Sequence, residues 1–203
     1  MPSLKFGNLY ELLDSLMLFG ATIESTDAAE GSWRLRIRRN KMNGRKFAWA
    51  WAITESQDEG DIFRFLRMTF SLADAQVWDA RTQSTRFLQS MRERWYGIGP
   101  GVAPGTGPTT RRTPHLDLTD EMLTFWLVGS DSLTWLTSTG MTAAVGKRLA
   151  GIINKKYGWP CQFIPAVCGR HAAGLDLAKG DRTEIEAWLE ARVPRVVWDR
   201  RTV

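Results

Sequence analysis

A run rich in glycine and proline divides the chain and limits the folds it can adopt. Residues 97–108 read GIGPGVAPGTGP, and residues 109–114 continue as TTRRTP. Glycine is conformationally free, and proline fixes its φ angle and lacks an N–H donor, so neither a helix nor a strand is expected to run through this segment. We interpret 97–114 as a flexible linker between residues 1–96 and residues 115–203. A functional loop over a single domain is the alternative.

The N-terminal unit is predicted to be a compact α-β-β-β-α module. Leucines at positions 9, 12, 13 and 16 have the spacing of an amphipathic helix, which Gly20 would end. A β-hairpin is expected over 32–53 and a third strand over 62–70. A second helix is expected to begin near Ser71 and to run toward Trp95. The fold class is therefore α+β.

The C-terminal unit is predicted to be mainly helical. Helices are expected over 119–129, 131–137 and 142–157, an extended segment over 159–167, and a last helix from Asp181 to the stop at Pro194. The short helix, glycine-containing turn, second helix and extended segment favour a winged-helix-like unit. No internal repeat is visible in the sequence.

The most specific feature of the chain is a basic segment over residues 33–46, which contains seven cations and no acid. Trp33, Leu35 and Ile37 alternate with arginines, the period-two pattern of a half-buried strand. The pair Asn43-Gly44 is a strong hairpin signal. The segment is therefore predicted to form the first strand and turn of a β-hairpin.

Two registers of this hairpin are open. A two-residue turn would interleave the arginines with Trp49 and Trp51 and would create a stacking platform for bases. A five-residue loop over 40–44 would instead gather the large apolar side chains on a core face and leave the arginines outside among alanines. The second register is favoured because burying one large aromatic side chain stabilises the fold by roughly 2 kcal/mol.

Charge favours a polyanionic partner. The formal net charge is +5, and the arginines of the hairpin have no carboxylate beside them in the sequence. We expect contact with nucleic acid, with DNA favoured over RNA, through phosphates rather than base edges. The residues expected to make this contact are Arg34, Arg36, Arg38, Arg39, Lys41, Arg45 and Lys46 of the hairpin, Lys147, Arg148, Lys155 and Lys156 of helix 142–157, and Arg170 of a wing loop.

Motifs for catalysis and for metal binding are poor. The chain has no P-loop, dinucleotide fingerprint or nucleophile elbow. An acidic cluster could hold a divalent metal, but its glycine, serine and glutamine neighbours favour an ordinary turn. Two cysteines and a histidine have spacings unlike those of a zinc site. The residues concerned are Glu55, Asp58, Glu59 and Asp61 of the acidic cluster, and Cys161, Cys168 and His171. No catalytic residue, metal or cofactor is expected.

These observations favour a non-catalytic nucleic-acid-binding accessory or regulatory protein. Ten tryptophans and many arginines also suit a protein-binding adaptor or inhibitor, which is the alternative and would act in a protein complex. A metal-dependent nuclease is a weaker alternative. The absence of a long apolar run and the presence of only two cysteines favour a cytoplasmic protein without a membrane partner, of bacterial or phage type.

Overall fold

The computed structural model describes residues 4–27, 32–40, 44–57, 68–74, 77–82, 88–97, 112–138, 140–167, 172–177 and 182–198. These residues form helices and two antiparallel sheets, so the predicted α+β class is confirmed. Their side chains share a continuous hydrophobic core, which draws residues from both halves of the chain. None of the described helices is long and apolar enough to cross a membrane.

The N-terminal half follows the order helix, two strands, helix, two strands, helix. Its elements are α1 (Leu9–Phe19), β1 (Thr22–Asp27), β2 (Ser32–Asn40), α2 (Gly44–Gln57), β3 (Met68–Asp74), β4 (Val77–Thr82) and α3 (Leu88–Tyr96). The strands form one antiparallel sheet in the order β1-β2-β4-β3. The predicted α-β-β-β-α module therefore lacked one helix and one strand.

The C-terminal half repeats this order in reduced form. Its elements are α4 (Asp120–Gly129), β5 (Trp135–Thr137), α5 (Ala143–Tyr157), β6 (Gln162–Ile164), β7 (Gly174–Asp176), α6 (Arg182–Glu190) and α7 (Arg195–Trp198). The sheet order β5-β7-β6 matches β2-β4-β3, and an isolated bridge between Ser132 and Trp135 stands where a counterpart of β1 would lie. The chain is thus an imperfect structural repeat that its sequence does not reveal.

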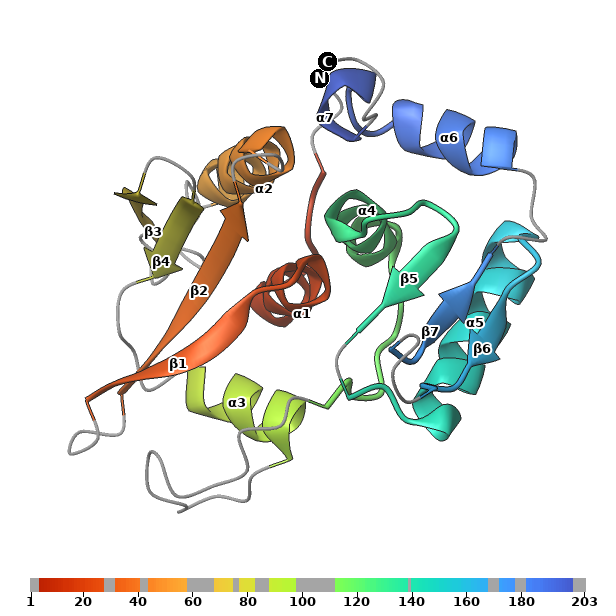
Figure 1. Cartoon of the computed structure of the whole chain (residues 1–203), viewed down its shortest axis with the longest axis horizontal. Coiled ribbons are helices and arrows are strands. Elements are labelled where there is room, and N and C mark those ends of the chain that lie inside the picture. Colours follow the sequence, from red (N-terminus) through yellow and green to blue (C-terminus); the bar gives the residue numbers. More distant parts are fainter. Residues whose placement is uncertain are drawn as a thin grey trace.

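The two halves meet along α1 and α4. These helices lie side by side at the centre of the molecule, between the four-stranded sheet and the three-stranded sheet (Figure 1). They approach closely because Gly129 has no side chain: a Cβ atom there would lie 2.8 Å from the Cα of Phe19. The predicted linker lies mostly in residues 98–111, outside the described part of the chain.

The predicted β-hairpin over 32–53 is wrong, because residues 44–57 form helix α2. The fully or nearly buried side chains there include Phe47, Ala50 and Thr54, which have helical rather than alternating spacing. Alanine is also the strongest helix former, and three alanines occur in this segment. Strand β2 pairs instead with β1 and β4, so neither predicted register exists.

Three further expectations about elements need correction. The second helix does not begin near Ser71, because β3 and β4 occupy 68–74 and 77–82, and α3 begins only at Leu88. The short helix over 131–137 is absent, and its last three residues form β5 instead. The winged-helix arrangement is not confirmed, because β5 precedes α5 and pairs with β7.

Candidate nucleic-acid interface

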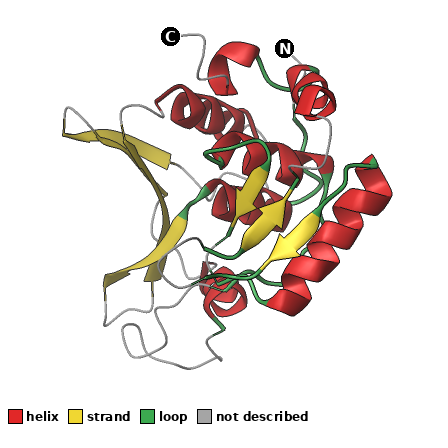
Figure 2. Ribbon diagram, turned by 45° about the vertical axis from the view of Figure 1, so that its right-hand side comes forward, coloured by secondary structure: helices red, strands yellow, loops and turns green. Residues whose placement is uncertain are grey.

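Strand β2 separates apolar and basic side chains onto the two faces of the larger sheet. Trp33, Leu35 and Ile37 are buried, whereas Arg34 and Arg36 are half-buried on the opposite face. The helices that the structure describes lie on the apolar side of this sheet (Figure 2). The alternation that the sequence predicted for this strand is therefore correct, although its partners are β1 and β4.

Helix α3 packs against the apolar face of the larger sheet. The guanidinium of Arg92 lies 4.0 Å from the centre of the Trp33 ring, a cation–π contact, and the Tyr96 hydroxyl accepts a hydrogen bond from the Ile23 amide at 3.3 Å. Because both strands are anchored in this way, the opposite face carries its polar side chains on a well-supported backbone.

Glu24 of β1 links the two arginines on that opposite face. The Arg36 guanidinium lies 3.1 Å from the Glu24 carboxylate, and the Arg34 guanidinium lies 3.4 Å from it. The three side chains together retain one net positive charge. Each is 19–29% exposed, and exposed or partly exposed ion pairs stabilise a fold by only about 0.2–1 kcal/mol. The arginines can therefore exchange this carboxylate for another anion at small cost.

The pairing of β2 with β4 continues this polar face across the larger sheet. Arg36 is paired with Arg81 of β4, and Arg38 is paired with Asp79. The side chains of Arg38, Arg39 and of strands β3 and β4 lie outside the described part of the structure. The described part of this face therefore consists mainly of Glu24, Arg34 and Arg36. We call Arg34 and Arg36 the arginine pair.

The remaining predicted cations of the first half have different surroundings. Arg45 is exposed at the start of α2. Lys46 is buried, and its ammonium donates a hydrogen bond of 2.7 Å to the carbonyl of Ser130, at the C-terminal end of α4. A cation there complements the negative end of the helix dipole. Lys41 and Arg170 lie outside the described residues.

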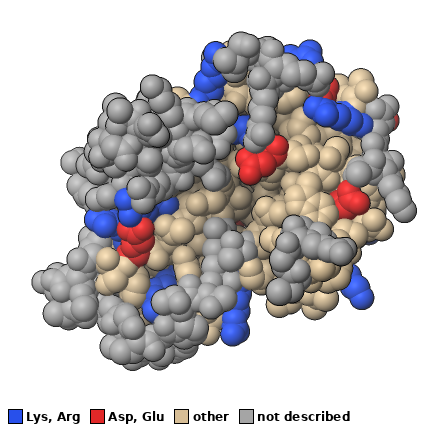
Figure 3. All heavy atoms as spheres, viewed as in Figure 1, with Lys and Arg blue, Asp and Glu red and all other residues tan. Residues whose placement is uncertain are grey.

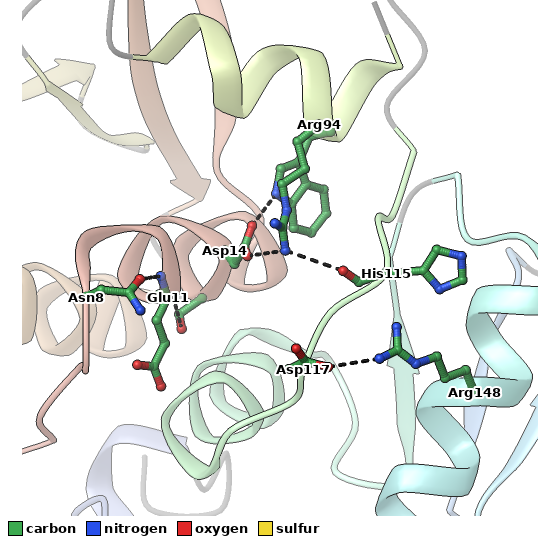
Figure 4. Close-up of polar contacts among 9 residues, drawn as sticks. Asn8, Glu11, Asp14, Arg94, His115, Asp117 and Arg148 are labelled. Carbon is green, nitrogen blue, oxygen red and sulfur yellow. Dashed lines mark hydrogen bonds and ion pairs between the residues drawn. The ribbon is translucent and has the colours of Figure 1, made fainter.

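The four predicted cations of α5 are all exposed, and two of them form ion pairs. Arg148 donates to Asp117 at 2.9 Å (Figure 4), and Lys156 lies 2.7 Å from Asp120. Lys147 and Lys155 are exposed. The structure does not bring these four residues together with the arginine pair, because α5 packs against the smaller sheet on the far side of α4.

Asp120 is the centre of a polar cluster in this half. Besides Lys156, it accepts hydrogen bonds from the hydroxyl of Tyr157 at 2.8 Å and from Arg192 at 3.1 Å. Burial alone would raise the pKa of Asp120, but the hydrogen bonds and the positive charges around it hold that pKa below its usual value. The cluster joins α4, α5 and the end of α6, so we assign it a structural role.

A cavity of about 470 Å³ opens at the ends of α1 and α4, where the two halves meet. It is lined mainly by small residues, among them Gly20, Gly129 and Ser138, and by the exposed residue Asp131. Sequence reasoning missed this place, because only the packing of α1 on α4 joins segments more than a hundred residues apart.

Metal ligands are sparse in the described part of the molecule. No group of three histidine, cysteine or acidic side chains there could hold a metal ion. The acidic cluster is not covered by this finding, since Asp58, Glu59, Asp61 and the side chain of Glu55 are outside the described residues. Burial raises the pKa of the Cys161 thiol to about 12, as expected for an unreactive cysteine. Cys168 and His171 also lie outside the described residues.

Comparison with known proteins gives a structural likeness only. No family model and no curated protein matches the chain. Among solved structures it is similar to the homing endonuclease I-WcaI bound to its DNA recognition sequence. The TM-score is 0.56 and the sequence identity 12%, over 94% of this chain and 86% of that one. At this identity the likeness shows a shared fold.

This likeness corrects the function expected from the sequence. The chain was expected to be a non-catalytic protein, either an accessory nucleic-acid-binding protein or an adaptor. Its fold is similar to that of a homing endonuclease bound to DNA, which contradicts the expectation of a protein without catalysis. The contact of α1 with α4, which joins the two halves, links segments far apart in the sequence, so local sequence patterns did not indicate this fold.

Proposed function

We propose that this protein binds duplex DNA through the face of the larger sheet that carries the arginine pair. The observation that carries the proposal is the position of the half-buried, partly accessible Arg34 and Arg36 on a strand whose other face is buried. Arginine forks suit phosphates and the guanine edge, and antiparallel strands can enter a major groove. The similarity of the fold to a homing endonuclease bound to DNA supports this assignment.

The proposal explains the pairing of both arginines with Glu24. Held by one carboxylate, the two guanidinium groups keep a defined spacing in the free protein, so less side-chain entropy is lost when they bind DNA. The partly exposed ion pair is weak enough to be rearranged on contact with a phosphate. The sheet is therefore a pre-ordered cationic surface.

Measuring duplex affinity at several salt concentrations tests this proposal. The double variant Arg34→Gln/Arg36→Gln should bind a duplex more weakly than the parent. Its slope of log affinity against log salt should be smaller by about two units, since each phosphate contact contributes about 0.9. The matched control is Arg182→Gln/Arg195→Gln, which removes two arginines that are also exposed and ion-paired, but on α6 and α7. Equal losses in both variants, or a parent without salt-dependent binding, would contradict the proposal.

A second candidate function is cleavage of the bound strand. It is favoured by the likeness to an endonuclease and by Asp131, an acidic residue that lines the cavity at the ends of α1 and α4. Nuclease chemistry usually uses carboxylate-bound divalent metal ions. The described residues supply one carboxylate to this cavity and do not form a complete metal site, so we derive no metal-dependent step.

Cleavage is tested by incubating the protein with plasmid and linear duplex in magnesium or manganese. Nicking that disappears in Asp131→Asn but persists in Asp117→Asn would support catalysis at the cavity. Asp117 is the control because its carboxylate is almost fully exposed and lies on the segment that leads into α4. Nicking that survives in both variants would place catalysis elsewhere, and no nicking under any condition would contradict this second function.

A further inference from the structure

The two sheets that flank α1 and α4 are unequal in size. The strands of the larger sheet have six to nine residues, whereas β5, β6 and β7 have three each. At about 3.3 Å per residue, nine residues extend over about 30 Å and three residues over about 10 Å. Only the larger sheet is long enough to follow a groove for most of a helical turn of DNA.

The outer faces of the two sheets also differ in charge. In the smaller sheet Leu136 and Leu175 are buried, so the other face is formed by their strand neighbours. Gln162 donates to Asp176 at 3.4 Å on that face, and a Cβ atom on Gly174 would lie 3.0 Å from the Trp135 ring. None of the residues in β5, β6 and β7 is a lysine or an arginine.

The surface view agrees with this difference. Basic and acidic side chains adjoin over β1 and β2, whereas most of the described atoms over the smaller sheet belong to uncharged residues (Figure 3). The smaller sheet packs against α5, and the exposed cations there belong to the helix and not to the strands: Lys147, Arg148, Lys155 and Lys156. The exposed Arg182 and Arg195 lie on α6 and α7. That sheet therefore offers DNA neither length nor positive charge.

We propose that the duplex is held asymmetrically, by the larger sheet alone, although the fold is built from two related halves. This inference rests on the proposed DNA binding. Strands of six to nine residues extend over about six to nine base pairs, at about 3.4 Å per base pair. The protein then recognises one uninterrupted half-site on one side of the α1 and α4 helices, and the smaller sheet makes no groove contact.

The test introduces the same negative charge on each sheet. Thr22 on β1 and Gln162 on β6 are both exposed on the outer faces, Thr22 opposite Arg36 and Gln162 opposite Asp176. Affinity for a 30-base-pair duplex of random sequence is measured for the parent, Thr22→Glu and Gln162→Glu. Thr22→Glu should weaken binding by about tenfold at low salt, because a carboxylate would face phosphates. Gln162→Glu should bind like the parent.

The outcomes separate this inference from the function on which it rests. Equal weakening by both substitutions would overturn the asymmetry and leave DNA binding intact. Weakening by Gln162→Glu alone would overturn both the asymmetry and the assignment of the larger sheet. A parent that does not bind the duplex would contradict the proposed function itself. Thermal unfolding of each variant checks that the introduced charge has not disrupted its sheet.

Discussion

Asp14 joins three segments of the chain through a buried carboxylate on α1. Its two oxygens accept hydrogen bonds from the Trp95 indole at 2.7 Å and from Arg94 at 2.9 Å. Arg94 also donates to the carbonyl of His115 at 3.4 Å, so α1, α3 and the segment entering α4 meet here (Figure 4). Burial raises the pKa of Asp14, although the Trp95 hydrogen bond and the Arg94 charge oppose the rise.

The raised pKa of Asp14 predicts a pH-dependent stability. The folded protein holds this proton more tightly than the unfolded chain, whose Asp has a pKa near 3.8. The stabilisation is therefore fully present below that pH and is lost as the pH rises through the folded pKa. Asp14→Asn should remove this dependence. Relative to the variant, the parent should lose unfolding free energy as the pH rises above 3.8, measured by urea titration between about pH 3 and pH 7. A constant difference between the two proteins would contradict the raised pKa.

The negative charge of Glu24 is expected to lower the affinity of the protein for DNA. Its carboxylate lies beside both arginines of the proposed DNA-binding face and would repel phosphates. Glu24→Gln should therefore raise affinity for a duplex by about fivefold, since partly exposed charges interact by about 1 kcal/mol. Glu184→Gln is the control, because it makes the same change of charge at an exposed position on α6. A similar gain in both variants would indicate an effect of net charge rather than of the arginine pair.

At the scale of elements, the contact between α1 and α4 depends on one small residue. A Cβ atom on Gly129 would lie 2.8 Å from the Cα of Phe19 and 2.9 Å from its carbonyl oxygen, both backbone atoms of α1. Neither can move unless the helices separate. The distance between the two halves is thus set where α4 ends, next to the cavity that Asp131 lines.

A pair of glycine substitutions tests this contact. Gly129→Ala should lower the unfolding free energy by about 1–3 kcal/mol, because the added methyl group overpacks a rigid contact. Gly151→Ala on α5 should raise it by up to about 1 kcal/mol, because alanine favours a helix and, apart from the adjoining backbone of α5, no atom lies within 4 Å of the added methyl group. Chemical denaturation of both variants measures the difference. Equal effects would show that the helix contact tolerates a side chain.

At the scale of the whole molecule, the described residues of both halves share one hydrophobic core. Side chains on α1, on α4 and on both sheets belong to the same hydrophobic cluster. Trp49 of α2 packs against Phe125 of α4 with ring centres 4.8 Å apart, and Phe6 packs against the same ring at 5.5 Å. Separating the halves would expose these aromatic rings to water. The division at residues 97–114 remains a prediction about the chain, and the shared core predicts how a cut there would behave.

Limited proteolysis distinguishes a linker from an integral loop. We expect the first cut to fall within residues 97–114, and the two fragments to stay together in gel filtration because their common core holds them. An intact chain treated without protease is the control. Fragments that separate and each retain a cooperative unfolding transition would show two independent domains. First cuts outside 97–114 would contradict the linker.

The sequence by itself determined the features that depend on near neighbours. Helix α1 begins at its N-cap Asn8 and ends at Gly20, which has a φ of 113°, and both signals are local. The helices expected to start at Thr119 and Thr142 do start there, again through capping side chains. The alternation along β2 determined which side chains are buried, because each large apolar group gains about 2 kcal/mol from burial whatever strand lies beside it.

Tertiary structure alone decided the partners of these elements. Residues 44–57 alternate like a strand, yet they contain alanines suited to a helix. Packing of Phe47 and Trp49 into the common core, beneath the sheet and against α4, selects the helix. The pairing of β2 with β4, the contact of α1 with α4 and the cavity at their ends join segments far apart in the chain. Local preferences cannot specify such contacts, because the contacts form only when the chain folds. The residues that make them share no sequence pattern.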